Sequence, residues 1–512
     1  MKSKSTFKKW NGVGGVIIPI NQRVLSSKII FSIKFLIIYC LFNTLTLQSL
    51  KAETLSEVAL FYRCYYQITG VRVKTTDLLL DQVKKGSKTA ISACLQVLNL
   101  AQLTSTPNST LVNSSNDIAK KVLINFHRLH YSWFSSKDFP VISWGGHNFD
   151  VKDLYDVTSP ALYFTRALFK PGVPVKDVIT TNDFLTPIRT LSSPVQGPES
   201  GHTVADFIFS DAFSFAPKGE LQGMQASAPA VINFPANPIS KPYRPAGNVN
   251  LNMTLGGGLL GTQPYLLLNI GSLSSIGTYM TDGGLKMHRI WGRAVFKDLL
   301  CRDLPVVRVA DVNSFVDPKS SIPFRTSNAC TKCHASHDRI SGVIRGMKVL
   351  YVGDGDESKM GDKKRGGNFT TFHPVVKPPE TSWSASPDVD YYQRPTNGQL
   401  FFRDYLGNLI DQPISNVPDL GTKISDLDDF YICVAKRYYS YFTGIEIDNG
   451  DLGDPNHGLY PNAAETAHRD IVIKLGLKLK TSQNLTQLIT DILNLELYKS
   501  SDFGIRSGVN VK

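Results

Sequence analysis

Cys330, Cys333 and His334 form a C-x-x-C-H sequence in the second half of this 512-residue chain. Two thiols three positions apart can each add across one of the two vinyl groups of a haem. The histidine that follows then lies close enough to the iron to become its proximal ligand. The spacing therefore predicts that one haem c is bound covalently through Cys330 and Cys333, with His334 on the iron.

Three other kinds of site use a C-x-x-C pair. Half of a zinc site would need a second C-x-x-C or an H-x-x-x-H, and the sequence contains neither. A thioredoxin-like pair would need a buried strand before it and a helix that opens at the first cysteine, and residues 321–328 do not read as a buried strand. A disulfide within the four residues is the third alternative, and it would leave His334 without a role.

The N-terminus has the composition of an export signal, which haem c attachment outside the cytoplasm requires. Residues 1–52 contain eight Lys or Arg and no Asp or Glu, and an apolar run over 29–42, interrupted by Lys34, precedes a candidate cleavage point after Ala52. The sequence therefore predicts a periplasmic or otherwise exported bacterial protein. Membrane contact is expected only if this segment stays uncleaved as an anchor.

The net charge does not indicate a nucleic-acid partner. Removal of residues 1–52 takes eight charges from the formal +12 and leaves +4. The basic character therefore belongs mainly to the targeting segment. With 42% apolar and 19% charged residues, the remaining chain has the composition of an ordinary globular protein.

Four cysteines remain after the haem pair and Cys40 of the export signal are set aside. An even number in an oxidising compartment predicts two disulfides, for which three connectivities exist. The favoured pairs are Cys64–Cys94, which is local, and Cys301–Cys433, which would join the segments on either side of the haem site.

Apolar periodicity predicts a mainly α fold with irregular and short-strand regions, arranged as a helical multi-domain protein like a c-type cytochrome. Helices are expected at about 55–69, 88–101, 117–134 and 287–301, and two more close the chain, one ending at Gly444 and one around Leu485–Leu495. Short strands or buried turns are expected at 205–209, 230–234 and 265–270. The expected division is 1–52 signal or anchor, 53–140 N-terminal helical domain, 141–286 mixed loop-rich region, 287–390 haem-binding domain and 391–512 C-terminal helical domain.

Two further clusters have simpler interpretations than a ligand site. His127 and His130 lie three apart beside an aromatic stripe and are interpreted as ordinary, partly exposed residues rather than a distal ligand or metal site. The acidic groups at 354–362 and 448–454 lack the register of an EF-hand loop and are interpreted as solvated loops.

The second half of the chain resembles the planctomycete-type cytochrome c proteins that are built of domains of unknown function. The similarity covers about 260–505 and lies in four pieces that occur in the family's order: residues 261–266 (GTQPYL), 291–305, 325–338 with the haem motif and Asp338, and 397–438. Members often carry His-Arg before the motif, where this chain has Phe324-Arg325. The resemblance implies haem and export without naming a reaction.

The sixth ligand of the iron would decide the function. Met347 is the favoured distal ligand, with Met360, His288 and His373 as alternatives. A ligated iron favours transfer of electrons to a partner protein that the sequence does not identify. An open position would favour a haem-dependent oxidoreductase or peroxidase. In a third alternative the haem is structural in a surface or periplasmic binding protein.

Overall fold

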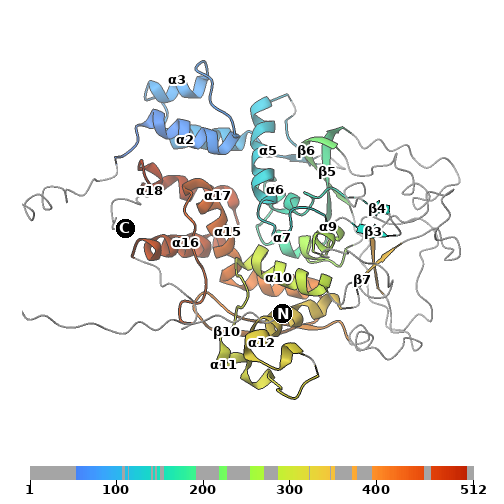
Figure 1. Cartoon of the computed structure of the whole chain (residues 1–512). Helices are drawn as coiled ribbons and strands as arrows, with labels where there is room; N and C mark the ends of the chain where they lie inside the picture. Colours follow the sequence, from blue (N-terminus) through green and yellow to red (C-terminus); the bar gives the residue numbers. More distant parts are fainter. Residues whose placement is uncertain are drawn as a thin grey trace, which may run out of the picture. The chain divides into compact units, whose positions relative to one another are not determined.

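The chain folds mainly into helices in the computed structural model, with short antiparallel strands between them (Figure 1). The structure describes residues 53–105, 110–113, 115–139, 142–144, 147–149, 155–191, 218–227, 254–269, 286–321, 323–345, 347–351, 372–376, 395–454 and 463–503. The helices are α2 (Glu57–Thr69), α3 (Leu78–Lys84), α4 (Ala90–Asn99), α5 (Asp117–Tyr131), α6 (Ala161–Phe169), α7 (Asp177–Thr180), α9 (Gln263–Leu268), α10 (Lys286–Leu300), α11 (Val309–Val312), α12 (Asn328–Ile340), α14 (Val417–Asp426), α15 (Asp428–Thr443), α16 (Ala463–Ser482), α17 (Leu485–Asn494) and α18 (Glu496–Lys499).

The helices begin and end where capping residues allow. The hydroxyl of Ser56 accepts a hydrogen bond from the amide of Ala59 at the start of α2, and the side chain of Asn116 does the same for Ile118 and Ala119 at the start of α5. Gly444 ends α15 in the left-handed conformation (φ 71°). The helices predicted at 55–69, 88–101, 117–134 and 287–301 are confirmed as α2, α4, α5 and α10, with ends shifted by no more than three residues.

All strand pairs are antiparallel. One four-stranded sheet has the order β1-β2-β6-β5, and three hairpins pair β9 with β10, β3 with β4 and β7 with β8. The strands are β1 (Thr104–Ser105), β2 (Thr110–Leu111), β3 (Ile142–Trp144), β4 (His147–Phe149), β5 (Phe184–Leu191), β6 (Lys218–Ser227), β7 (Met347–Tyr351), β8 (Phe372–Val376), β9 (Gly398–Arg403) and β10 (Leu409–Ile414).

The prediction of a strand or turn at 265–270 is wrong, because most of this segment belongs to α9. Thr262 caps α9, Pro264 lies in its first turn, and every residue from Gln263 to Leu268 is buried. Full burial removes the polar face that would give a helical period. The same cause hid α6, in which all nine residues are buried.

One large core runs through the described residues of 53–512, which form a single compact unit. The core contains residues from each segment that was expected to be a domain, such as Phe61, Leu259, Trp291 and Tyr438. The boundaries at 140, 286 and 390 therefore do not separate independent cores. The two ends of the unit also meet, because the guanidinium of Arg63 donates to the backbone oxygens of Tyr498 (2.7 Å) and Ser500 (2.8 Å).

Both favoured cysteine pairs lie at disulfide distance. Cys64 in α2 faces Cys94 in α4 with a Cα–Cα distance of 6.1 Å, and Cys301, directly after α10, faces Cys433 in α15 at 5.2 Å. The first pair joins two neighbouring helices. The second joins the helix that precedes the haem motif to the C-terminal helices.

Several predictions fall outside the described residues: the export signal at 1–52, the strands at 205–209 and 230–234, and the acidic group at 354–362. Among the helices that the structure describes, none combines the length and the apolar composition that a membrane crossing needs.

Candidate functional site

The C-x-x-C-H motif lies at the start of α12. The hydroxyl of Thr331 donates to the backbone oxygens of Ser327 (2.8 Å) and Phe324 (3.1 Å), which fastens the first turn of the helix to the short 3-10 turn before it (Pro323–Arg325). On a helix, positions i, i+3 and i+4 share one face. The two thiols and the imidazole of His334 therefore share one face of α12.

Both cysteines of the motif are free thiols, with Cys330 exposed and Cys333 half-buried. Burial raises the pKa of Cys333, although the positive charges of Lys332 and Arg293 oppose the shift. The thiol of Cys333 therefore stays protonated at neutral pH. Neither thiol is committed to a disulfide, so the pair is available for covalent chemistry.

The imidazole of His334 is held on one face and at one nitrogen. The ring of Phe324 stacks on it with a centroid distance of 4.2 Å and an interplanar angle of 16°. Nδ1 lies 2.8 Å from Oδ2 of Asp338, one helical turn later. Nε2 has no hydrogen bond to any residue that the structure describes. A metal binds an imidazole nitrogen in the plane of the ring, so the stacked Phe324 does not compete with a metal at Nε2.

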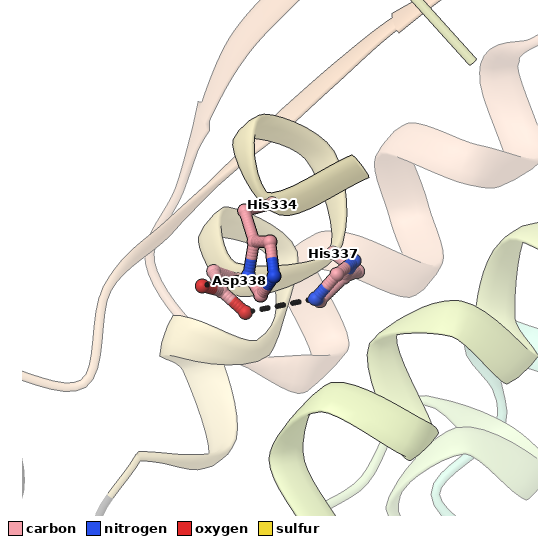
Figure 2. A group of neighbouring side chains, drawn as sticks. All are labelled: His334, His337 and Asp338. Carbon is pink, nitrogen blue, oxygen red and sulfur yellow. Dashed lines mark hydrogen bonds and ion pairs between the residues drawn. The ribbon is translucent and has the colours of Figure 1, made fainter. Parts of the chain in front are cut away.

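Asp338 contacts the imidazoles of His334 and His337 (Figure 2), and it also pairs with the guanidinium of Arg289. Its Oδ1 lies 3.0 Å from Nε2 of His337 and 3.0 Å from Nε of Arg289 in α10. Burial alone would raise the pKa of Asp338, but the hydrogen bonds from His334 and His337 and the charge of Arg289 hold it well below its usual range. The carboxylate is therefore ionised, and Nδ1 of His334 carries the proton of their hydrogen bond.

α10 packs closely on α12 because of Gly292. A Cβ atom at this position would lie only 2.5 Å from the backbone oxygen of His337. One turn away, His288 is fully buried, and its Nε2 lies 3.0 Å from the backbone oxygen of Ile344. The absence of a side chain at Gly292 thus brings Arg289 within reach of Asp338. His288 contacts Ile344, which lies in the 3-10 turn after α12 (Ser341–Ile344).

His334, His337 and Asp338 also satisfy the simplest requirement of a metal site, since one ligand atom from each lies within 4.8 Å of the others. No further group of this kind occurs in the part of the chain that the structure describes. The two thiols are not members of the group. Nδ1 of His337 is buried and has no hydrogen-bond partner among the described residues. A divalent ion is therefore an alternative occupant that elemental analysis can distinguish from haem iron.

The predicted distal ligands are only partly described. Met347 opens β7 opposite Val376, and His373 lies in β8 opposite Leu350. The structure describes the backbone of both residues and not their side chains. Met347 therefore stays a predicted ligand.

His127 and His130 are not partly exposed as predicted: their exposed fractions are 4% and 0%. The two rings lie on either side of the Thr165 hydroxyl at 3.1 and 3.0 Å, and Nε2 of His130 lies 2.7 Å from the hydroxyl of Tyr438. Burial lowers the pKa of both, that of His127 to about 3. They are neutral members of a buried hydrogen-bonded network.

The acidic loop at 448–454 does not gather its carboxylates. Asp451 is paired with Arg308 at 2.6 and 2.8 Å, and its Oδ1 also accepts from the amide of Gly453. Its carboxylate is therefore paired within the fold rather than solvated as predicted.

The sequence indicated the candidate ligands and missed the residues that position them. Asp338 was noticed only as part of the family resemblance, although its spacing of four from His334 on a helix predicts contact. Arg289 could not be found in this way, since it comes from another helix. Comparisons with models of known families, with curated proteins and with solved structures give no match for this chain.

Proposed function

We propose that this protein is an exported c-type cytochrome that carries one haem and transfers single electrons to a partner protein. Cys330 and Cys333 would attach the haem and His334 would be its proximal ligand. The observation that carries the proposal is the arrangement on α12: two free thiols and an imidazole share one face, and Asp338 fixes the imidazole so that Nε2 is left for a metal.

When bound, the haem would supply an iron that takes up and releases one electron. The chain's own residues perform the other tasks. The thiols fix the position of the group, Phe324 sets the rotation of the His334 ring, and Asp338 sets its tautomer. Because an ionised carboxylate makes an imidazole a stronger electron donor, Asp338 also favours the oxidised state of a ligated iron.

The same hydrogen bond supports a second candidate, a haem-dependent oxidoreductase or peroxidase. Strong electron donation from a proximal histidine helps an iron with an open sixth position to react with peroxide. The optical spectrum of the purified holoprotein separates the two functions. A low-spin spectrum that added cyanide and peroxide leave unchanged supports electron transfer, and a high-spin spectrum that responds to them supports the enzyme.

The test of haem attachment is the double variant Cys330→Ala/Cys333→Ala. We expect it to lose haem that stays with the polypeptide in denaturing gels. The matched control is Cys64→Ala/Cys94→Ala, which removes two cysteines from another part of the fold and should keep the covalent haem. Covalent haem in the first variant would refute the proposal, as would a metal analysis of the native protein that finds zinc in place of one iron.

A further inference from the structure

The Cys301–Cys433 pair is reachable from outside at one sulfur only. Cys301 is half-buried and lines two hollows, of about 580 and 390 Å³, whereas Cys433 is 1% exposed and lines neither. A nucleophile must approach a disulfide sulfur from the side opposite its partner. Sγ of Cys433 is buried, so a nucleophile that enters either hollow can reach only Sγ of Cys301.

An arginine lies against this sulfur in the smaller hollow, which is lined by basic side chains (Lys297, Lys436 and Arg437) and by two acidic ones (Asp303 and Glu446). Nε of Arg437 lies 3.4 Å from Sγ of Cys301, and Arg437 follows Cys433 by one turn of α15. The guanidinium has a spare donor, because its buried Nη1 has no hydrogen-bond partner among the described residues. Lys436 lines both hollows, and Lys297 borders the smaller one. A negative sulfur would therefore be stabilised at this position.

The Cys64–Cys94 pair offers a comparison within the same chain. Both of its residues are 0% exposed, and the neighbours of the sulfurs are the backbone oxygens of Phe61 and Ala90. Both cysteines lie in regular helices, whereas Cys301 has a left-handed backbone (φ 52°), which is uncommon for a residue other than glycine. Only one of the two pairs combines access with positive charge.

We propose that Cys301–Cys433 is a thiol–disulfide exchange site for a small thiol that enters the hollow beside Arg437 and Lys436. The thiolate attacks Sγ of Cys301, the bond between the cysteines breaks, and Sγ of Cys433 leaves with the electron pair and takes up a proton. A second small thiolate then attacks the outer sulfur of the mixed disulfide, a bond forms between the two small thiols, and Sγ of Cys301 leaves with the electron pair and takes up a proton. Two small thiols are oxidised to one disulfide, and the two cysteines of the protein are reduced.

The two cations have separate tasks in this scheme. Lys436, which lines both hollows, attracts the incoming thiolate. Arg437, which keeps its charge at neutral pH although burial lowers its pKa to about 10, lies 3.4 Å from Sγ of Cys301 and stabilises the negative charge that develops there when this sulfur leaves the mixed disulfide. The exchange does not depend on haem, so its failure would leave the proposed electron transfer untouched.

The experiment treats the folded, full-length protein with increasing concentrations of reduced glutathione, alkylates free thiols and maps them by mass spectrometry. We expect Cys301 and Cys433 to become alkylated at concentrations at least about tenfold below those that affect Cys64 and Cys94. When the reaction is quenched early, the glutathione adduct should lie on Cys301. Equal resistance of both pairs, or an adduct on Cys433, would overturn the proposal.

Variants test the role of charge. Arg437→Gln should slow the reduction of Cys301–Cys433 about tenfold and leave Cys64–Cys94 unchanged. If this variant does not fold because Arg437 is buried against Trp133, Lys436→Gln replaces it, since the half-buried Lys436 has no hydrogen bond to a described residue. Arg63→Gln, on another part of the surface, is the matched control. If neither Arg437→Gln nor Lys436→Gln changes the rate at which Cys301–Cys433 is reduced, the proposed mechanism is wrong.

Discussion

Nδ1 of His334 donates a hydrogen bond to Oδ2 of Asp338 across 2.8 Å, within one turn of α12. The geometry is that of a metal-ligating histidine oriented by a carboxylate. It restricts the imidazole to the tautomer in which Nε2 is unprotonated. Both residues of this hydrogen bond belong to α12, so the helix alone fixes the tautomer of the ring. Arg289 and His337 contact the carboxylate and position it.

We predict that Asp338→Asn keeps covalent haem and raises its reduction potential. The neutral amide donates less electron density through His334, which destabilises the oxidised iron by about 1 kcal/mol, equivalent to about 40 mV. A spectroelectrochemical titration measures the shift. Asp338→Glu, which keeps the charge, is the control and should shift the potential less. A potential that stays constant in Asp338→Asn would show that the carboxylate does not act on the iron.

We predict that Gly292→Ala disturbs the site at a distance from the ligands. The new Cβ would meet the backbone oxygen of His337, so α10 must move away from α12 and Arg289 must release Asp338. We expect a loss of about 1–3 kcal/mol in the free energy of unfolding together with a changed haem spectrum. Gly444→Ala, at a position with no atom within 4 Å of the new Cβ, should lower stability and leave the spectrum unchanged. If Gly292→Ala and Gly444→Ala both kept the native haem spectrum, the packing of α10 on α12 would not affect the site.

Acid should weaken the fold through His127. The unfolded chain binds a proton at this residue near the ordinary pKa of 6.5, and the folded chain resists it down to about 3 because the ring is buried. The contribution to stability is complete above pH 6.5 and is lost as the pH falls toward 3, by about 3 kcal/mol between pH 7 and pH 4. Urea unfolding at several pH values should show a shallower decline for His127→Gln than for the native protein. Parallel curves would mean that this histidine does not titrate as described.

Removal of the Cys64–Cys94 link should cost about 3–4 kcal/mol in the free energy of unfolding. The two residues are 30 apart in sequence, and the estimate is the loop-closure entropy that such a link removes from the unfolded chain. Guanidinium unfolding of Cys64→Ala/Cys94→Ala beside the native protein, both under non-reducing conditions, measures it. A loss below about 1 kcal/mol would indicate that α2 and α4 are held together by packing alone.

The sequence was sufficient for features that lie close together along the chain. The cap at Ser56, the end of α15 at Gly444 and the local Cys64–Cys94 pair all follow from short-range patterns. Features that depend on distant contacts were hidden. His127 and His130 seemed half-exposed because Thr165 and Tyr438, which complete their network, come from residues far away in sequence. The buried α6 and α9 had no polar face to reveal them.

The contact between Arg63 and the backbone of Tyr498 and Ser500 also has a consequence for timing. During synthesis α2 emerges early, but the backbone of Tyr498 and Ser500 emerges only with α18, the last helix that the structure describes. The contact between Arg63 and the C-terminal backbone can therefore form only late, long after residues 330–334 have left the ribosome. A cofactor that is attached through those residues could therefore be attached before the fold is complete. The last helices would then pack after attachment.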